Sequence, residues 1–197
     1  FDPTAAYFGC KKGSEPLHIQ WNAYTVSIEV MNTSFRNGTG LTARIEVFNL
    51  DGSQKFSESI PFNSREDSRL ILAPHPRPQG LSEVYFLRLR IEKGKQILRE
   101  NLYWRALNGI DLSAVQNVPP VKLNQNTIRE RKLGKWLLTT TLENPSAHPA
   151  LMARLKVVGE QSGERILPAL FSDNYLTLLP GTKTRIEMEV NERDTRG

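Results

Sequence analysis

Hydrophobic and polar residues alternate along this chain in several short stretches that are separated by turn-forming residues. The alternation is clearest in residues 26–30, 41–47, 151–157 and 186–190, where every second residue is apolar or small. Because successive side chains of a β-strand point to opposite faces, this period of two predicts strands with one buried face. No stretch of comparable length keeps the 3.6-residue period of a helix, so the pattern predicts an all-β protein.

Turn signals divide the first half of the chain into strands of suitable length. Asp51-Gly52 separates two alternating stretches and predicts a hairpin, because this dipeptide tolerates the positive φ of a tight turn. Lys93-Gly94-Lys95 predicts a second hairpin in the same way. About seven short strands in ~100 residues are typical of an immunoglobulin-like β-sandwich.

The second half of the chain repeats motifs of the first half. The sequence Leu-Thr-Ala-Arg-Ile-Glu-Val at residues 41–47 returns as Leu-Met-Ala-Arg-Leu-Lys-Val at 151–157. Asn32 followed by Ser34 is matched by Asn144 followed by Ser146, and Leu72-Ala-Pro74 by Leu178-Leu-Pro180. A chain of 197 residues has the length of two domains of ~100 residues. We therefore predict two tandem immunoglobulin-like β-sandwiches.

The predicted boundaries follow changes in composition. We assign residues 15–107 to the first sandwich, 108–120 to a linker rich in Gly, Asn and Pro, and 121–197 to the second sandwich, with a possible helical turn at 110–115. Residues 1–14 differ in composition from the strands, and their apolar residues lie near the spacing of one helical face. We expect them to be a connection from a preceding domain that is only weakly held. Since the chain begins Phe1-Asp-Pro-Thr, without Met, we also expect it to be a piece of a longer protein.

Charge and cysteine content narrow the possible functions. Lys and Arg total 26 against 21 Asp and Glu, and the basic residues are interspersed with acidic ones on predicted strand faces such as 88–92. This distribution predicts a solvated surface and no nucleic-acid partner. The single cysteine, Cys10, excludes an internal disulfide, and no apolar run has the ~20 residues of a membrane span. Two glycosylation sequons begin at Asn32 and Asn37, but such short motifs are frequent by chance.

The residues that most often carry chemistry form no recognisable site. His18, His75 and His148 lack metal-ligand spacing, so we predict surface or loop roles and no metal. No Gly-X-Ser-X-Gly element and no glycine-rich phosphate loop occurs in the sequence, so we predict no catalytic residues and no cofactor.

Ser172-Asp-Asn-Tyr175 is the most prominent polar cluster between apolar stretches. Asp173 is its most tempting carboxylate, but Asp, Asn and Ser in such a place usually bind their own backbone at a turn. We therefore predict a structural motif formed by Asp173, Asn174 and Tyr175, in which the Tyr175 hydroxyl anchors a sheet corner.

The three tryptophans are the remaining candidates for ligand binding, because an exposed indole can stack on a sugar ring. Trp104 and Trp136 are in phase with apolar neighbours on predicted strands, which favours core positions for both. Trp21 is less clearly placed and is the weak candidate for carbohydrate binding.

Four segments together resemble a known enzyme family. They are Tyr-Phe-Gly-Cys-Lys-Lys at 7–12, Glu-Pro-Leu-His-Ile-Gln at 15–20, Asn-Leu-Tyr-Trp at 101–104, and Leu-Pro-Ala-Leu-Phe-Ser-Asp-Asn-Tyr at 167–175 followed by Leu-Pro-Gly at 179–181. In this order they are similar to the C-terminal part of glycoside hydrolase family 2, in the branch with exo-β-D-glucosaminidases, mannosylglycoprotein endo-β-mannosidases and β-mannosidases. Residues 13–14 are Gly-Ser where the family more often has Ala-Cys or Ala-Ala.

The resemblance implies a non-catalytic role for these residues. In that family the two catalytic carboxylates lie in a (β/α)8 barrel that precedes these segments, and none of their positions matches a residue of this chain. The implied partner is the catalytic barrel of the parent enzyme, in cis, with residues 1–14 as the tail of its last helix and an oligosaccharide as a possible further partner. A periplasmic or secreted location is favoured by the resemblance. The alternative is a free-standing carbohydrate-binding or adhesion module.

Overall fold

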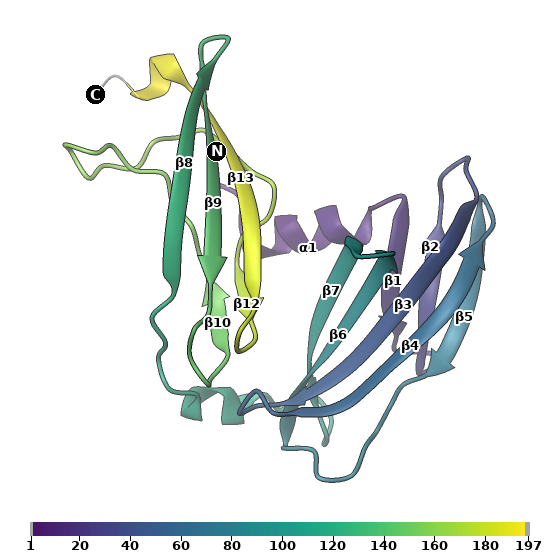
Figure 1. Cartoon of the computed structure of the whole chain (residues 1–197). Coiled ribbons are helices and arrows are strands. Elements are labelled where there is room, and N and C mark those ends of the chain that lie inside the picture. The colour runs from purple at the N-terminus through teal and green to yellow at the C-terminus, as the bar shows by residue number, and fades with distance from the viewer. Residues whose placement is uncertain (1, 196–197) are drawn as a thin grey trace. The chain divides into compact units, whose positions relative to one another are not determined.

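The computed structural model describes residues 2–195, which form two compact units. Lys11–Val118 make up one unit, and residues 2–10 with 119–195 make up the other. Each unit is built around a β-sandwich of antiparallel sheets (Figure 1). The predicted all-β fold of two immunoglobulin-like sandwiches is therefore confirmed. No helix among the described residues has the length and apolar character needed to cross a membrane.

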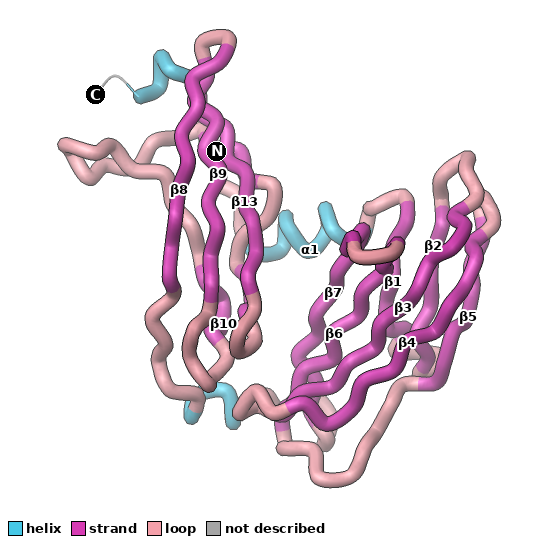
Figure 2. The backbone as a smooth tube through the Cα atoms, in the orientation of Figure 1, coloured by secondary structure: helices cyan, strands magenta, loops and turns pink. Residues whose placement is uncertain are grey.

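The first sandwich has a three-stranded and a four-stranded sheet (Figure 2). In order across each sheet, the strands are β1 (Leu17–Asn22), β2 (Ser27–Asn32) and β5 (Ser68–Pro74), then β4 (Gln54–Ser64), β3 (Gly38–Asn49), β6 (Val84–Lys93) and β7 (Gln96–Ala106). Both predicted hairpins are present: Gly52 has φ +88° between β3 and β4, and Gly94 has φ +58° between β6 and β7.

The core of the first sandwich consists mainly of the apolar residues whose alternation predicts the strands. Ala43, Ile45 and Val47 of β3 are fully buried, as are Leu87 and Leu89 of β6. β2 differs from the predicted pattern at two positions. Val26 lies in the turn before the strand, with φ +51° and 44% exposure, whereas Glu29, which we expected on the solvent face, is completely buried.

Side chains of β7 close one edge of this sandwich by bonding to the backbone of β1. Three alternating residues of β7 take part, and they reach three alternating residues of β1. The three bonds are Arg99 Nε to the Leu17 carbonyl at 2.9 Å, Asn101 Nδ2 to the Ile19 carbonyl at 3.4 Å, and the Trp21 N–H to the Tyr103 hydroxyl at 3.4 Å. We call this set the β7–β1 bridge. It satisfies groups on an edge strand that would otherwise be open to solvent or to another strand.

The second sandwich is smaller and more irregular. Its four-stranded sheet has the order β11 (Ala169–Phe171), β13 (Lys183–Asn191), β9 (Lys135–Glu143) and β8 (Asn124–Lys132), and its second sheet has only β10 (Ala150–Ala153) and β12 (Leu176–Leu178). Leu142, Ala150 and Leu178 form one buried cluster of its core.

The strand expected at 151–157 is shorter than the alternation suggests. Only Ala150–Ala153 pairs as a strand, with Met152 at φ +53°, and residues 154–157 belong to no strand. The backbone of Leu155 is bonded to a side chain instead of a neighbouring strand. Alternation of side chains therefore persists here beyond the point where strand pairing ends.

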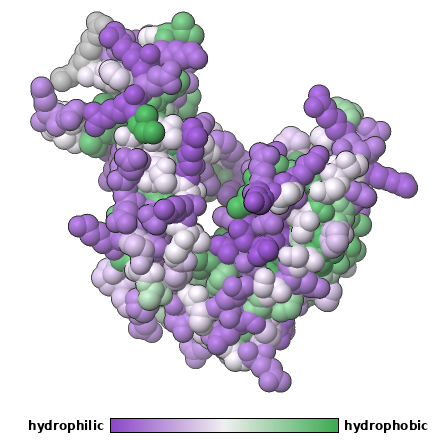
Figure 3. All heavy atoms as spheres, in the orientation of Figure 1, coloured by the Kyte–Doolittle hydropathy of each residue, from purple (hydrophilic) through white to green (hydrophobic). Residues whose placement is uncertain are grey.

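The remaining elements are short helices. Residues 113–117, in the predicted linker, form the 3-10 helix η1 (Ser113–Asn117), and η2 (Glu192–Thr195) follows β13. α1 (Ala5–Gly13) lies near the N-terminus, and its Phe8 is only 4% exposed. Phe8 is therefore packed, and the weak hold that we expected for residues 1–14 stays a prediction. Hydrophilic side chains cover most of the molecular face seen in Figure 3.

Candidate functional site

The predicted motif at 172–175 is a turn whose Asn174 side chain replaces a strand partner. Asn174 is 6% exposed, and its Oδ1 accepts the Leu155 N–H at 2.8 Å while its Nδ2 donates to the Leu155 carbonyl at 3.0 Å. One amide thus satisfies both backbone groups of a residue that has no neighbouring strand. Asp173 accepts the Asn174 N–H at 2.9 Å. These bonds support the structural role that we predict for the motif.

Tyr175 contributes its ring to the surface beside this turn. Its backbone is in the left-handed region, with φ +57°, and its N–H donates to Asn174 Oδ1 at 3.0 Å. The ring lies 6.2 Å from that of Phe8, between centroids, and the Arg154 guanidinium carbon is 5.3 Å from its centre. We expected the Tyr175 hydroxyl to anchor a sheet corner, whereas the side-chain contacts that the structure describes are made by the ring.

Two arginines next to Tyr175 hold the carboxylate of Asp2. Arg165 Nη2 lies 2.7 Å from Asp2 Oδ1, and Arg154 Nη2 lies 2.8 Å from Oδ2 and 3.1 Å from Oδ1. The hydrogen bond from Arg165, together with those from Arg154, lowers the pKa of Asp2 to about 2. We call residues 2–10 the N-terminal arm, and Arg154, Arg165, Asn174 and Tyr175 the arm seat.

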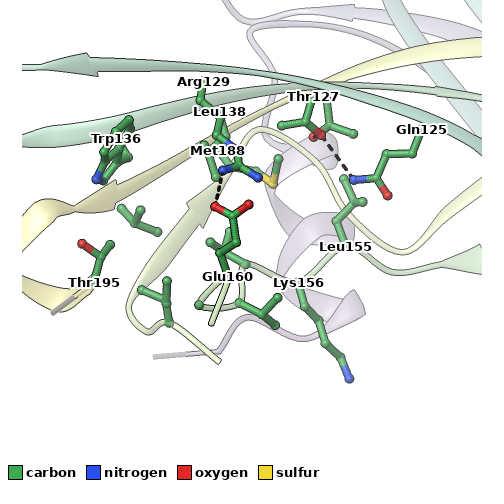
Figure 4. A pocket seen from close by; sticks show the side chains of 16 residues that line it. Gln125, Thr127, Arg129, Trp136, Leu138, Leu155, Lys156, Glu160, Met188 and Thr195 are labelled. Carbon is green, nitrogen blue, oxygen red and sulfur yellow. Dashed lines mark hydrogen bonds and ion pairs between the residues drawn. The ribbon is translucent and has the colours of Figure 1, made fainter. Parts of the chain in front are cut away.

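A groove of about 380 Å³ lies elsewhere in the second sandwich, between its larger sheet and residues 155–166 (Figure 4). Trp136 and Leu138 of β9 line it from the sheet, with Met188 of β13. Arg129 and Glu160 form an ion pair at 2.9 Å. We expected Trp136 in the core, but it is half-buried and lines this groove. The groove could not be predicted from the sequence, because residues 155–166, which form the side opposite the sheet, have no regular secondary structure.

One face of the Trp21 ring is covered by a guanidinium group. The Arg105 guanidinium carbon lies 3.6 Å from the centre of one ring face, and the rings of Tyr103 and His75 lie 6.1 and 6.0 Å away. These contacts do not favour carbohydrate binding at Trp21, which stays a prediction. Trp104 packs edge-to-face on Phe86 at 6.2 Å but is half-buried, whereas we expected it in the core.

The carboxylates most deeply buried in the first sandwich are held by arginine. Arg69 bonds to both oxygens of Glu29 at 2.9 and 2.6 Å and, with smaller contributions from Thr25 and Asn22, lowers the pKa of Glu29 to about 2. Burial alone would raise the pKa of Glu46, but Arg88 and Arg90 outweigh burial and lower it. A general acid of a glycosidase needs a raised carboxyl pKa. The lowered pKa values of Glu29 and Glu46 therefore favour structural roles for both carboxylates.

We expected surface or loop positions for the three histidines; His75 and His148 lie in loops, whereas His18 lies on β1, and both His18 and His75 are buried. His18 is 5% and His75 is 7% exposed, whereas His148 is exposed. His75 Nε2 lies 2.8 Å from the Tyr85 hydroxyl, which provides a partner for one of the two ring nitrogens. Burial, with the nearby charge of Arg105, lowers the pKa of His75 to about 4.

Comparison with known proteins identifies the family. Residues 101–197 match the family model for the exo-beta-D-glucosaminidase Ig-fold domain. These residues belong to that domain family. The matched region starts within β7 and includes the whole described part of the second sandwich, with the arm-seat arginines and the turn at 172–175. The resemblance of the sequence motifs to the glucosaminidase and mannosidase branch of glycoside hydrolase family 2 is thereby confirmed.

Relatives extend the similarity to the full chain. All of it aligns at 30% identity with an exo-beta-D-glucosaminidase from Amycolatopsis orientalis, and 95% of it at 25% identity with a mannosylglycoprotein endo-beta-mannosidase from Lilium longiflorum. The chain covers only 21% and 26% of these proteins, respectively.

Solved structures agree with this grouping. The crystal structure of Amycolatopsis orientalis exo-chitosanase CsxA matches with a TM-score of 0.91 at 27% identity, over 100% of this chain and 26% of that chain. A β-D-mannosidase from Dictyoglomus thermophilum shares the fold, with a TM-score of 0.64 at 16% identity, over 94% of this chain and 21% of that chain.

Proposed function

We propose that this chain is a non-catalytic accessory region of a glycoside hydrolase family 2 enzyme that acts on β-glucosaminides or β-mannosides. Its role is to brace the catalytic barrel of the same polypeptide. The observation that carries the proposal is the structural match of the whole chain to about a quarter of the exo-chitosanase CsxA.

The chemistry of the buried groups supports a non-catalytic role. Hydrolysis of a glycosidic bond in this family needs two carboxyl groups on either side of the sugar, one of which donates a proton. Glu29 and Glu46 are instead fixed by arginines that favour their ionised forms. Asp2 is fixed in the same way, with a pKa of about 2.

Expression of the longest reading frame that contains this chain tests the proposal. We expect that reading frame to include a barrel, and the complete enzyme to release p-nitrophenol from the β-D-glucosaminide or the β-D-mannoside. The purified 197-residue chain should release none. Turnover by this chain that disappears when one of its own residues is changed would overturn the non-catalytic assignment. A reading frame without a barrel would overturn the bracing role.

The groove lined by Trp136 is the observation that favours the alternative, a carbohydrate-binding module. The groove has a half-buried indole at one end and polar side chains such as Gln125 and Thr127 at the other, which together are a reasonable contact surface for a sugar. Titration of the chain with glucosamine and mannose oligosaccharides, followed by Trp fluorescence, tests this alternative. A saturable change that is lost in Trp136→Ala and kept in Trp104→Phe would favour binding over bracing.

A further inference from the structure

The contacts between the N-terminal arm and the second sandwich have two separate parts, one ionic and one aromatic. At the ionic part, Arg154 comes from the segment after β10, and Arg165 from the irregular segment before β11. Both bond to Asp2 within 2.8 Å, so the carboxylate is bound from two directions. Such paired guanidinium contacts select a carboxylate over a neutral side chain.

At the aromatic part, α1 turns Phe8 toward the ring of Tyr175. Phe8 is 4% exposed, and Tyr7 beside it meets its ring edge-on at 5.1 Å while staying 44% exposed itself. Six positions separate Phe8 from Asp2, and the helix begins between them at Ala5. The arm therefore presents an acidic residue and a helical aromatic residue to two fixed partners.

The arm seat is organised by bonds that do not involve the arm. Asn174 fixes the backbone of Leu155, the residue after Arg154, and also bonds to the N–H of Tyr175. One buried amide thereby positions both the ionic and the aromatic partner. Since a prearranged site loses little conformational freedom when its ligand arrives, this design suits binding of a separate segment.

We propose that the second sandwich is a receptor for the N-terminal arm, which it recognises by an Asp and, six residues later, a Phe on a helix. The arm is thus a separable ligand rather than an integral part of that sandwich, because the described contacts between them are made by side chains. The inference goes beyond the proposed function, which concerns a catalytic barrel outside this chain, because both the arm and its binding site lie within this chain. It assigns the binding of residues 2–10 to the second sandwich.

A peptide added in trans tests the proposal in the full chain. The Asp2→Asn/Phe8→Ala double variant should release its own arm and leave the seat open. A labelled synthetic peptide of residues 2–13, carrying Cys10→Ser, should then bind this variant at least about tenfold more tightly than it binds the wild-type chain, whose tethered arm competes at high effective concentration. Fluorescence anisotropy measures the binding, which should weaken as salt is raised because of the ionic part.

Matched variants distinguish recognition from nonspecific adhesion. A peptide carrying Asp2→Asn and Phe8→Ala should not bind, and Arg154→Gln/Arg165→Gln in the double-variant chain should abolish binding of the unchanged peptide. The proposal would be overturned if the two peptides bound the double-variant chain equally. It would also be overturned if the unchanged peptide bound that chain equally with and without Arg154→Gln/Arg165→Gln.

A milder variant covers the case in which the double variant does not fold. In Asp2→Asn alone, hydrogen exchange at Ala5–Gly13 should quicken a few-fold, while Asp111→Asn, in the linker, should leave it unchanged. Unchanged exchange in Asp2→Asn would overturn the proposal, as would equal acceleration across the strands of the second sandwich, because the arm would then be part of its fold.

Discussion

Asn32 and Asn144 make matching hydrogen bonds at equivalent points of the two sandwiches. Asn32 ends the second strand of its sandwich, and Asn144 directly follows the second strand of the other. Each is at most 2% exposed, and its side-chain oxygen accepts the N–H and the hydroxyl of a serine two residues later. Each also donates to the carbonyl four residues ahead and to a distant one: Asn32 to Arg36 and Arg65 at 2.9 and 2.8 Å, Asn144 to His148 and Leu178 at 2.8 Å. The repeat seen in the sequence is thus a repeated buried turn.

Replacement of either asparagine by alanine should destabilise mainly its own sandwich. Two carbonyls lose their donors, so we expect a loss of about 2 to 4 kcal/mol in the free energy of unfolding. Urea denaturation followed by strand-specific hydrogen exchange checks where the loss falls. Asn124→Ala, on exposed β8, is the control and should change stability by less than about 0.5 kcal/mol. Equal weakening of both sandwiches by either variant would contradict independent turns.

Within the 172–175 turn, Asn174 should matter more for stability than Asp173. Asn174→Ala leaves both backbone groups of Leu155 without their partner, which should cost about 2 kcal/mol, against about 1 kcal/mol for Asp173→Ala. Thermal unfolding of the two variants provides the comparison. If Asp173→Ala were the more damaging, the carboxylate and not the amide would be the centre of the motif.

Acid should weaken the first sandwich before its carboxylates titrate. The pKa of His75 falls from 6.5 to about 4 on folding, so the unfolded chain takes up its proton first. Stability contributed by the neutral ring is complete above pH 6.5 and should decline by up to about 3 kcal/mol as pH falls to 4. Burial lowers the pKa of His18 as well, so it acts in the same direction.

Urea titrations at several pH values should show a flatter profile for His75→Gln than for the wild type. His148→Gln, in an exposed loop, should leave the wild-type slope intact. A variant at His75 with the full wild-type slope would show that other groups cause the decline.

A second loss of stability should follow at lower pH, through Glu29. Its pKa is lowered from 4.5 to about 2 by Arg69, so its contribution is present above pH 4.5 and disappears as pH falls toward 2. Glu29→Gln should destabilise the first sandwich at pH 7 and remove part of this acid sensitivity. Glu58→Gln, exposed on β4 of the same sandwich, is the control. An unchanged stability at pH 7 would show that the Arg69 pair contributes little.

Alternation predicted most of the first sandwich because its strands are long, and their inward residues are uniformly apolar in β3 and β6. It misplaced Glu29, since the pattern alone cannot reveal that Arg69 on β5 lies next to it. It also extended a strand through 151–157, where the side chains still alternate but Asn174 takes the place of a neighbouring strand. Side-chain periodicity reports which face is buried, and says nothing about backbone pairing.

The arm seat was less accessible to sequence reasoning than the fold. The turn at 172–175 stood out by its composition, and its structural character follows from the tendency of Asn to bond to backbone. In the sequence, Arg154 and Arg165 resemble the many other exposed basic residues of the chain. A short local pattern cannot show that Arg154 bonds to Asp2, which lies 152 positions away.

The β7–β1 bridge has a consequence for how this protein tolerates mutation. By apolar pattern alone, Leu or Val at Arg99 and Asn101 would look like improvements to the interior. Such changes would remove the caps from the Leu17 and Ile19 carbonyls and leave an edge able to recruit a strand from another molecule. The polar residues of β7 therefore protect this edge from pairing with another strand, and substitutions there that raise hydrophobicity should increase self-association.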